Sequence, residues 1–255
     1  MADAKPKPTI VFIPGAWHSP AGFDGLLPPL HAAGYLTTAI HLPSTGVSPG
    51  LTSLDPDVKA VRDVVCGLVE LGREVVIVAH SYGGVPTTEA LAGLSLAQRK
   101  SSGLSGGVSH LIFISALVPR KGYNTLESMG PVKAAEDGGP TTNQVDNGDN
   151  TTSVLNGEDC FYHDVSPQIA RYFSRLLTLQ SSGPFSSMIT YESYRDISTL
   201  YVVCTEDRAL NIDTQRWMVK AAGIEAIKEL PSSHSPFLSM PEKVVDIIRD
   251  FVETK

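Results

Sequence analysis

Ser81 has the sequence context of a catalytic nucleophile. It follows residues 75–79, an apolar run that predicts a buried strand, and it precedes a segment with helical character. In so tight a strand-to-helix turn the serine side chain stands clear of the sheet. The residues two positions before and after it approach each other closely, so both must be small. Ala79 and Gly83 meet that requirement. The segment therefore predicts a nucleophile elbow with Ser81 at its tip.

A nucleophilic serine also needs a general base, and that base needs a carboxylate to orient it. Chains with this elbow carry the three groups in the order serine, acid, histidine. His234 lies in the loop after the last predicted strand, where the base is expected. Glu206 and Asp207 both follow the predicted strand 200–204 and compete for the role of acid. We predict Asp207, which lies one step further from the strand and just before a turn. The earlier strand end, at residues 116–118, offers no carboxylate.

An oxyanion hole completes this set of groups. Acyl transfer develops negative charge on the carbonyl oxygen of the substrate, and two backbone N–H groups usually hold that charge. One donor is expected from Tyr82, directly after the nucleophile, and the other from the loop 14–18 after the first strand. Within that loop we predict Ala16 as the donor. The helix that begins after the nucleophile points the positive end of its dipole at the same place.

Strand-like and helix-like segments alternate in the parts of the chain that must position these groups. A doubly wound, mostly parallel sheet follows from that alternation. The predicted strands are 9–13, 36–41, 75–79, 111–114, 200–204 and 225–230. The predicted helices are 23–33, a segment from Asp55 to Gly72, one after Ser81, one from Pro167, 212–222 and one from Ser239. Asp55 is expected to cap its helix, Ser166 and Pro167 are expected to start another, and Ser239 with Glu242 is expected to form a capping box.

The alternation stops between about residues 119 and 197. Residues 136–159 are dense in glycine, asparagine, aspartate and threonine, without apolar periodicity, which is typical of a loop. We therefore expect a core formed by residues 1–118 and 198–255, with residues 119–197 inserted as a cap or lid.

Composition narrows the function class. The net charge of −7 and the lack of a dense lysine and arginine stripe argue against a nucleic-acid partner. The N-terminus lacks the apolar run of a signal peptide, no segment has the length of a membrane span, and the three cysteines show no paired spacing. We expect a cytoplasmic protein that needs no metal or cofactor and takes a small-molecule substrate. A homodimer is left open.

With these motifs the chain resembles the plant methylesterase and hydroxynitrile lyase branch of the α/β-hydrolases, and related small esterases of fungi and bacteria. The resemblance lies in the segments 14–18, 79–84 and 204–207 and in His234. It implies an α/β-hydrolase fold. Lyases of that branch typically carry a threonine in the oxyanion loop and a lysine after the catalytic histidine. This chain has Ala16 and Ser235 at those positions, which is similar to the esterase side.

The main hypothesis is a serine hydrolase that cleaves a carboxylic ester or lactone of a hydrophobic small molecule. Pocket walls are expected from four aromatic residues, Trp17, Phe173, Phe185 and Phe237. Two alternatives stay open. The same triad could serve as acid and base in a lyase, isomerase or cyclase of a secondary-metabolite pathway. The fold could also belong to a binding protein without turnover.

Overall fold

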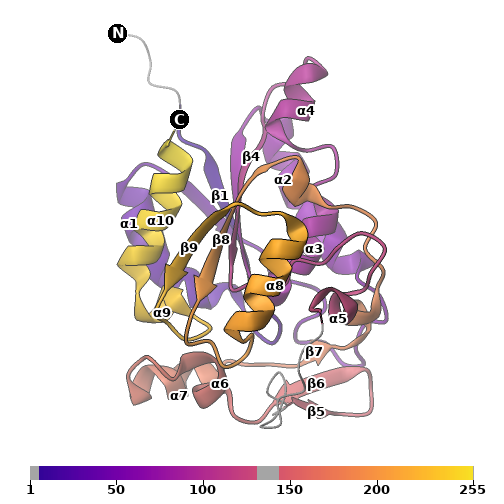
Figure 1. Cartoon of the computed structure of the whole chain (residues 1–255), viewed down its shortest axis with the longest axis vertical. Coiled ribbons are helices and arrows are strands. Elements are labelled where there is room, and N and C mark those ends of the chain that lie inside the picture. Colours follow the sequence, from indigo (N-terminus) through magenta and orange to yellow (C-terminus); the bar gives the residue numbers. More distant parts are fainter. Residues whose placement is uncertain (1–5, 131–143, 255) are drawn as a thin grey trace.

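The central sheet has six parallel strands in the spatial order β2-β1-β3-β4-β8-β9 (Figure 1). The strands are β1 (Thr9–Ile13), β2 (Leu36–Ala39), β3 (Glu74–His80), β4 (Gly107–Ile114), β8 (Ser198–Cys204) and β9 (Ala226–Leu230). This computed structural model describes residues 6–130 and 144–254. The predicted doubly wound parallel sheet is confirmed, with strand bounds within three residues of expectation at most ends.

Helices cover both faces of the sheet, because the strands are apolar on both sides. In β1, Ile10 and Phe12 pack into one layer, and Val11 and Ile13 into the other. The first layer is closed by η1 (Pro20–Leu26), α1 (Leu27–Ala32), α9 (Pro236–Ser239) and α10 (Pro241–Glu253). The second is closed by α2 (Asp55–Glu70), α3 (Gly84–Ala90) and α8 (Ile212–Ala222). Figure 1 shows α1 and α10 on one side of the sheet and α2, α3 and α8 on the other. The short helix α4 (Leu96–Ser101) precedes β4.

The strand order reverses between β1 and β3. The chain leaves β1 toward the edge strand β2, and it leaves β3 in the opposite direction, toward β4. Loops at such a switch point diverge and leave a crevice at the carboxyl ends of the strands, where ligands of open α/β sheets bind. Ile13 of β1 pairs in register with Ala79 of β3. This register brings the loop after β1 next to the turn at Ser81.

We call the described residues 119–130 and 144–197 the cap segment. Most of it, including β5, β6, β7, α6 and α7, lies beyond the carboxyl ends of the strands (Figure 1), and its last residues run back along α3 to the start of β8. The cap segment contains a second, antiparallel sheet in the order β5-β6-β7. Its elements are α5 (Thr125–Ser128), β5 (Gln144–Asp146), β6 (Thr151–Val154), α6 (Gly157–Tyr162), α7 (Pro167–Arg175), β7 (Gln180–Ser181), η3 (Gly183–Ser186) and η4 (Ser193–Arg195).

One prediction in this segment is wrong. The expected loop 136–159 contains the hairpin β5–β6 and the start of α6, while its residues 136–143 lie outside the described residues. The hairpin strands are mostly polar, so they lack the alternation by which a strand is read from sequence. Pairing of β6 with β7 and complete burial of Thr151 stabilise it instead.

Some helix starts also differ from expectation. Asp55 is the first residue of α2 and does not cap it, and Ser239 ends α9, so no capping box precedes α10. The expected helix 23–33 is divided into η1 and α1, and α1 contains Pro28 and Pro29, which lack the N–H that an α-helix needs in its interior. The helix α7 starts at Pro167 as predicted, and the Ser166 side chain caps it by accepting a hydrogen bond from the Ile169 amide.

Candidate active site

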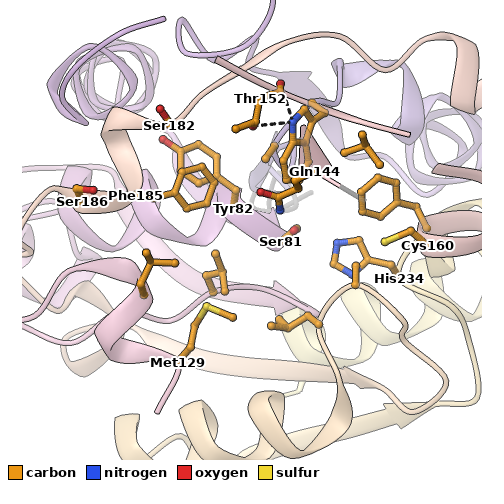
Figure 2. Close-up of a pocket in the computed structure, with 18 residues that line it drawn as sticks. Ser81, Tyr82, Met129, Gln144, Thr152, Cys160, Ser182, Phe185, Ser186 and His234 are labelled. Atoms are coloured by element: carbon orange, nitrogen blue, oxygen red, sulfur yellow. Dashed lines mark hydrogen bonds between the residues drawn. The ribbon is translucent and has the colours of Figure 1, made fainter. Parts of the chain in front are cut away.

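A cavity of about 410 Å³ opens at the switch point, between the ends of the strands and the cap segment. Ser81, Tyr82, Ala16 and His234 line it from the side of the main sheet. The cap segment contributes a mostly apolar wall, which includes Leu126, Met129, Val154, Cys160, Phe161 and Phe185. Figure 2 shows the Ser81 hydroxyl and the His234 ring close together, with Phe185 and Ser186 away from them across the cavity.

The turn at Ser81 has the steric properties expected of a nucleophile elbow. Ser81 adopts φ 53°, a left-handed conformation that is rare for a residue with a side chain. A Cβ atom on Gly83 would lie 2.6 Å from the carbonyl oxygens of both Ile13 and Pro14, and a Cβ on Gly15 would lie 2.8 Å from the Ser81 Cβ. Only glycine therefore permits the loops after β1 and β3 to meet at this distance.

Asp207 and His234 form a buried hydrogen-bonded pair. His234 Nδ1–H donates to Asp207 Oδ2 at 2.6 Å, and both side chains are almost completely buried. Asp207 Oδ1 accepts hydrogen bonds from the amides of Ala209, at 2.7 Å, and Leu210, at 2.8 Å. The neighbouring Glu206 side chain is exposed. Of the two acids that competed in the sequence, the structure brings Asp207 to the histidine.

The Ser115 hydroxyl donates a further hydrogen bond to Asp207 Oδ2. Ser115 follows β4, is completely buried and has φ 40°. The sequence gives no signal for Ser115, because the triad requires a carboxylate at such a strand end and a serine there is not distinctive. Trp17 (φ 64°), Ser81 and Ser115 thus carry left-handed backbone at the ends of three neighbouring strands. Such strain is concentrated at functional sites, where the surrounding structure enforces it.

The His234 loop is held from two directions. His80 Nε2–H donates to the His234 carbonyl oxygen at 2.9 Å, and the two rings lie 4.5 Å apart. From the cap segment, Asp164 Oδ2 accepts the Ser233 amide at 2.9 Å, and the Phe161 carbonyl accepts the Ser233 hydroxyl at 3.0 Å. Burial lowers the pKa of His80 well below its usual value, so this ring stays neutral beside His234.

The loop after β1 contributes Ala16, whose amide donates no hydrogen bond to any group in the described ranges and lies at the cavity. His18 Nδ1–H donates to the Ala16 carbonyl at 2.6 Å, and His18 Nε2 accepts the Tyr162 hydroxyl at 2.7 Å. Burial lowers the pKa of His18 to about 4, so the neutral ring can make both bonds. Tyr162 of α6 thereby fixes the loop from the cap side.

The sequence of this chain is similar to those of known hydrolases. Residues 10–247 match the model of the alpha/beta hydrolase family. The chain belongs to the alpha/beta hydrolase family. The alpha/beta hydrolase nvfD of Aspergillus novofumigatus is 29% identical to it over 96% of this chain and 96% of that protein. Methylesterase 9 of Arabidopsis thaliana is 24% identical over 92% of this chain and 94% of its own length.

Solved structures agree on the fold of this hydrolase. The crystal structure of polyneuridine aldehyde esterase superposes with a TM-score of 0.76, covering 97% of this chain and 100% of that chain at 18% identity. The predicted resemblance to the methylesterase branch, the α/β-hydrolase fold and the assignment as a hydrolase are confirmed by these matches.

Two expected pocket residues of the hydrolase lie elsewhere. Trp17 and Phe185 line the cavity, but Phe173 and Phe237 border a separate, much smaller crevice beside His18. Phe237 packs against His80 with ring centroids 4.9 Å apart, and neither residue lines the cavity. Phe237 thus packs against a residue that holds the His234 loop and does not form the cavity wall.

No group of three or more histidine, cysteine, aspartate or glutamate residues within 6–130 and 144–254 is arranged to hold a metal ion. Over the same residues, none of the helices has both the length and the apolar character required to cross a membrane.

Proposed function

We propose that this alpha/beta hydrolase cleaves a carboxylic ester or lactone of an apolar small molecule, with Ser81, His234 and Asp207 as its triad. One observation carries the proposal. A histidine whose Nδ1–H is held by a buried aspartate shares a cavity with a serine in a left-handed strand-to-helix turn. This combination supplies the nucleophile, the base and the orienting acid that a triad requires.

The proposed reaction has two acyl-transfer steps. Ser81 Oγ attacks the carbonyl carbon while His234 Nε2 takes the hydroxyl proton, and Asp207 keeps the Nδ1–H tautomer in place. The amides of Ala16 and Tyr82 hold the negative charge that develops on the carbonyl oxygen. The ester C–O bond then breaks, and His234 gives the proton to the departing alkoxide. The acyl group stays on Ser81 as an ester. Water attacks that ester with the same base, releasing the acid and restoring the serine.

The wall of the cavity supports an uncharged, apolar substrate. Apart from His234 of the proposed triad, no histidine, lysine, arginine, aspartate or glutamate is found among the described residues that line it. A charged substrate would have to give up its hydration without a partner, which is costly. The size of about 410 Å³ is typical of sites for small molecules. Similar proteins named as an esterase and a methylesterase agree with ester chemistry.

A panel of neutral aryl and alkyl esters and lactones tests the proposal. We expect hydrolysis by the wild-type protein and a loss of about 10⁴-fold or more in kcat/KM for Ser81→Ala and His234→Ala, because a triad acts as a unit. Ser109→Ala, on β4 and away from the cavity, serves as the matched control and should retain activity. Equal turnover by Ser81→Ala would remove the proposed mechanism.

The alternative is a reaction of the same triad without hydrolysis. Here His234 would move a proton on the substrate, and the oxyanion hole would hold an enolate. Turnover in ¹⁸O-labelled water separates the two. Hydrolysis places one labelled oxygen in the carboxylic acid product, whereas a lyase, isomerase or cyclase releases an unlabelled product.

A further inference from the structure

Gln180 of β7 is a completely buried polar residue that connects the cap segment to the core. Its Oε1 accepts hydrogen bonds from the Trp17 amide at 3.3 Å and from the Thr45 hydroxyl at 2.9 Å. Its Nε2 donates to Ser44 Oγ at 2.9 Å and to the Ser181 carbonyl at 3.3 Å. The Gln180 side chain of the cap segment therefore contacts the amide of Trp17. In our proposal the preceding residue, Ala16, is an oxyanion donor.

The same hydrogen bonds continue to the other oxyanion residue. Ser44 Oγ donates to Asp57 Oδ2 at 2.5 Å, and the Ser44 amide donates to Asp57 Oδ1 at 2.8 Å. The Tyr82 hydroxyl donates to Asp57 Oδ2 at 2.6 Å. Ser44 and Asp57 are 0% exposed and Tyr82 is 1% exposed. An unbroken buried path thus runs from Trp17 through Gln180, Ser44 and Asp57 to Tyr82.

We propose that Gln180, Ser44 and Asp57 form a positioning network that fixes the two sides of the oxyanion hole relative to each other. Through Gln180 the cap segment then takes part in catalysis as well as in substrate binding. This inference rests on the proposed function, because it takes Ala16 and Tyr82 as the donors. Neither Gln180 nor Asp57 lines the cavity, so their effect on the reaction must pass through Trp17 and Tyr82.

The chemistry of the path favours a rigid arrangement. A buried polar network is stable only when each group has its partner, so each member restricts the geometry of the next. Burial raises the pKa of Asp57, against the opposing effect of the hydrogen bonds from Ser44 and Tyr82. Burial and the nearby Asp57 raise the pKa of Tyr82, which keeps its phenol protonated as a donor. Displacing one member leaves a buried polar group without a partner.

Gln180→Met tests the network, since methionine has a similar length and makes none of the four hydrogen bonds. The readout is kcat/KM for a carboxylic ester and for its thionoester, in which sulfur replaces the carbonyl oxygen. Sulfur accepts hydrogen bonds weakly, so the thionoester gains little from the oxyanion hole. Because loss of a whole oxyanion donor costs about 10²–10³ in kcat, we expect a misplaced donor to lower the ester rate about tenfold or more. The thionoester rate should change much less.

Ser181→Ala is the matched control. Ser181 is adjacent to Gln180 in β7, completely buried, and bonds the core through the Leu51 amide and the Ser44 carbonyl, at 2.9 Å each. Loss of its hydroxyl weakens the contact between the cap segment and the core, but it leaves the hydrogen bonds of Gln180 intact. The ratio of kcat/KM for the ester to that for the thionoester should therefore stay at the wild-type value. Thermal unfolding of each variant reports on folding. If Gln180→Met does not fold, Ser44→Ala breaks the same path from the core side and should give the same selective loss.

A double-mutant cycle of Gln180→Met with Tyr82→Phe provides the second test. If one network positions both donors, the double variant should lose less activity than the product of the two single losses. The inference is wrong if Gln180→Met changes KM alone, or lowers ester and thionoester rates equally. A wild-type protein that hydrolyses no ester at all would instead overturn the proposed function, and this inference with it.

Discussion

Ser115 Oγ and the imidazole of His234 donate to the same oxygen atom, Oδ2 of Asp207. The serine lies at the end of β4, 92 positions from the aspartate in the sequence, and both are buried beneath the cavity. An aspartate with one oxygen fixed by two backbone amides and the other by a hydroxyl and the histidine has little freedom to rotate. The orientation of His234 therefore depends on a residue that does not itself line the cavity.

Ser115→Ala should lower kcat about tenfold with little change in KM, because a hydrogen bond to a charged group contributes about 1.5–3 kcal/mol. Steady-state kinetics with one soluble ester measures both constants. Ser109→Ala, within β4 itself, is the control, and it should behave as the wild type. An unchanged kcat for Ser115→Ala would show that the amides of Ala209 and Leu210 hold Asp207 without help.

Phe185→Ala should shift the substrate preference toward longer or bulkier esters. Phe185 lines the cavity and packs on Tyr82 with ring centroids 4.8 Å apart, so truncation enlarges the site away from Ser81. The expected change is a several-fold rise in kcat/KM for long chains relative to short ones, since one methylene is worth about 1 kcal/mol in an apolar pocket. Phe173→Ala, outside the cavity, is the control and should leave the chain-length profile unchanged.

Stability should fall as the pH drops from about 6.5 toward 4. An unfolded histidine binds a proton near pH 6.5, whereas burial lowers the pKa of His18 to about 4 and lowers the pKa of His80 well below its usual value. The unfolded chain then binds more protons in this range, so the free energy of unfolding decreases with falling pH. Each of these histidines contributes about 1.4 kcal/mol for each pH unit. Above pH 6.5 the contribution is fully present.

Urea unfolding between pH 7.5 and 4.5 measures this slope. His18→Gln keeps a donor and an acceptor but does not titrate. It should reduce the slope by the contribution of one histidine, about 1.4 kcal/mol for each pH unit. A midpoint that is independent of pH across this range would contradict the neutral, buried state of both rings.

Gly83→Ala should unfold the protein or abolish its activity. The added Cβ would lie 2.6 Å from the carbonyl oxygens of Ile13 and Pro14, and moving this backbone away would cost stability. Gly67→Ala in α2 is the matched control, because nothing lies within 4 Å of its Cβ position. That change should stabilise the protein by about 1 kcal/mol, since alanine favours a helix. Equal melting temperatures for the two variants would refute the close approach.

The elements near the site were predictable where local steric rules act. The turn at Ser81 requires small neighbours and a strand before it, and both are visible in the sequence. β1 and α8 agree with the sequence to the residue, because their apolar periodicity is strong. The candidate serine and histidine follow from the elbow motif, chain order and loop position, and the candidate aspartate from chain order and the strand end that it follows.

What was missed depends on contacts between distant segments. The hairpin β5–β6 carries polar residues whose stability comes from β7 and from the core, so its own sequence is typical of a loop. Phe173 and Phe237 were expected in the cavity because they are aromatic, but residue type does not determine which side of a loop a ring occupies. Gln180 and Ser115 show no local pattern at all.

Covalent labelling with a fluorophosphonate, followed by peptide mass spectrometry, tests whether Ser81 is the nucleophile. We expect one adduct per chain, located on Ser81, and labelling slowed by about 10²-fold or more in His234→Ala, because the base must activate the hydroxyl. Heat-unfolded protein should not be labelled. An adduct on another serine, or no adduct on the folded wild-type protein, would contradict the assignment of Ser81 as the nucleophile.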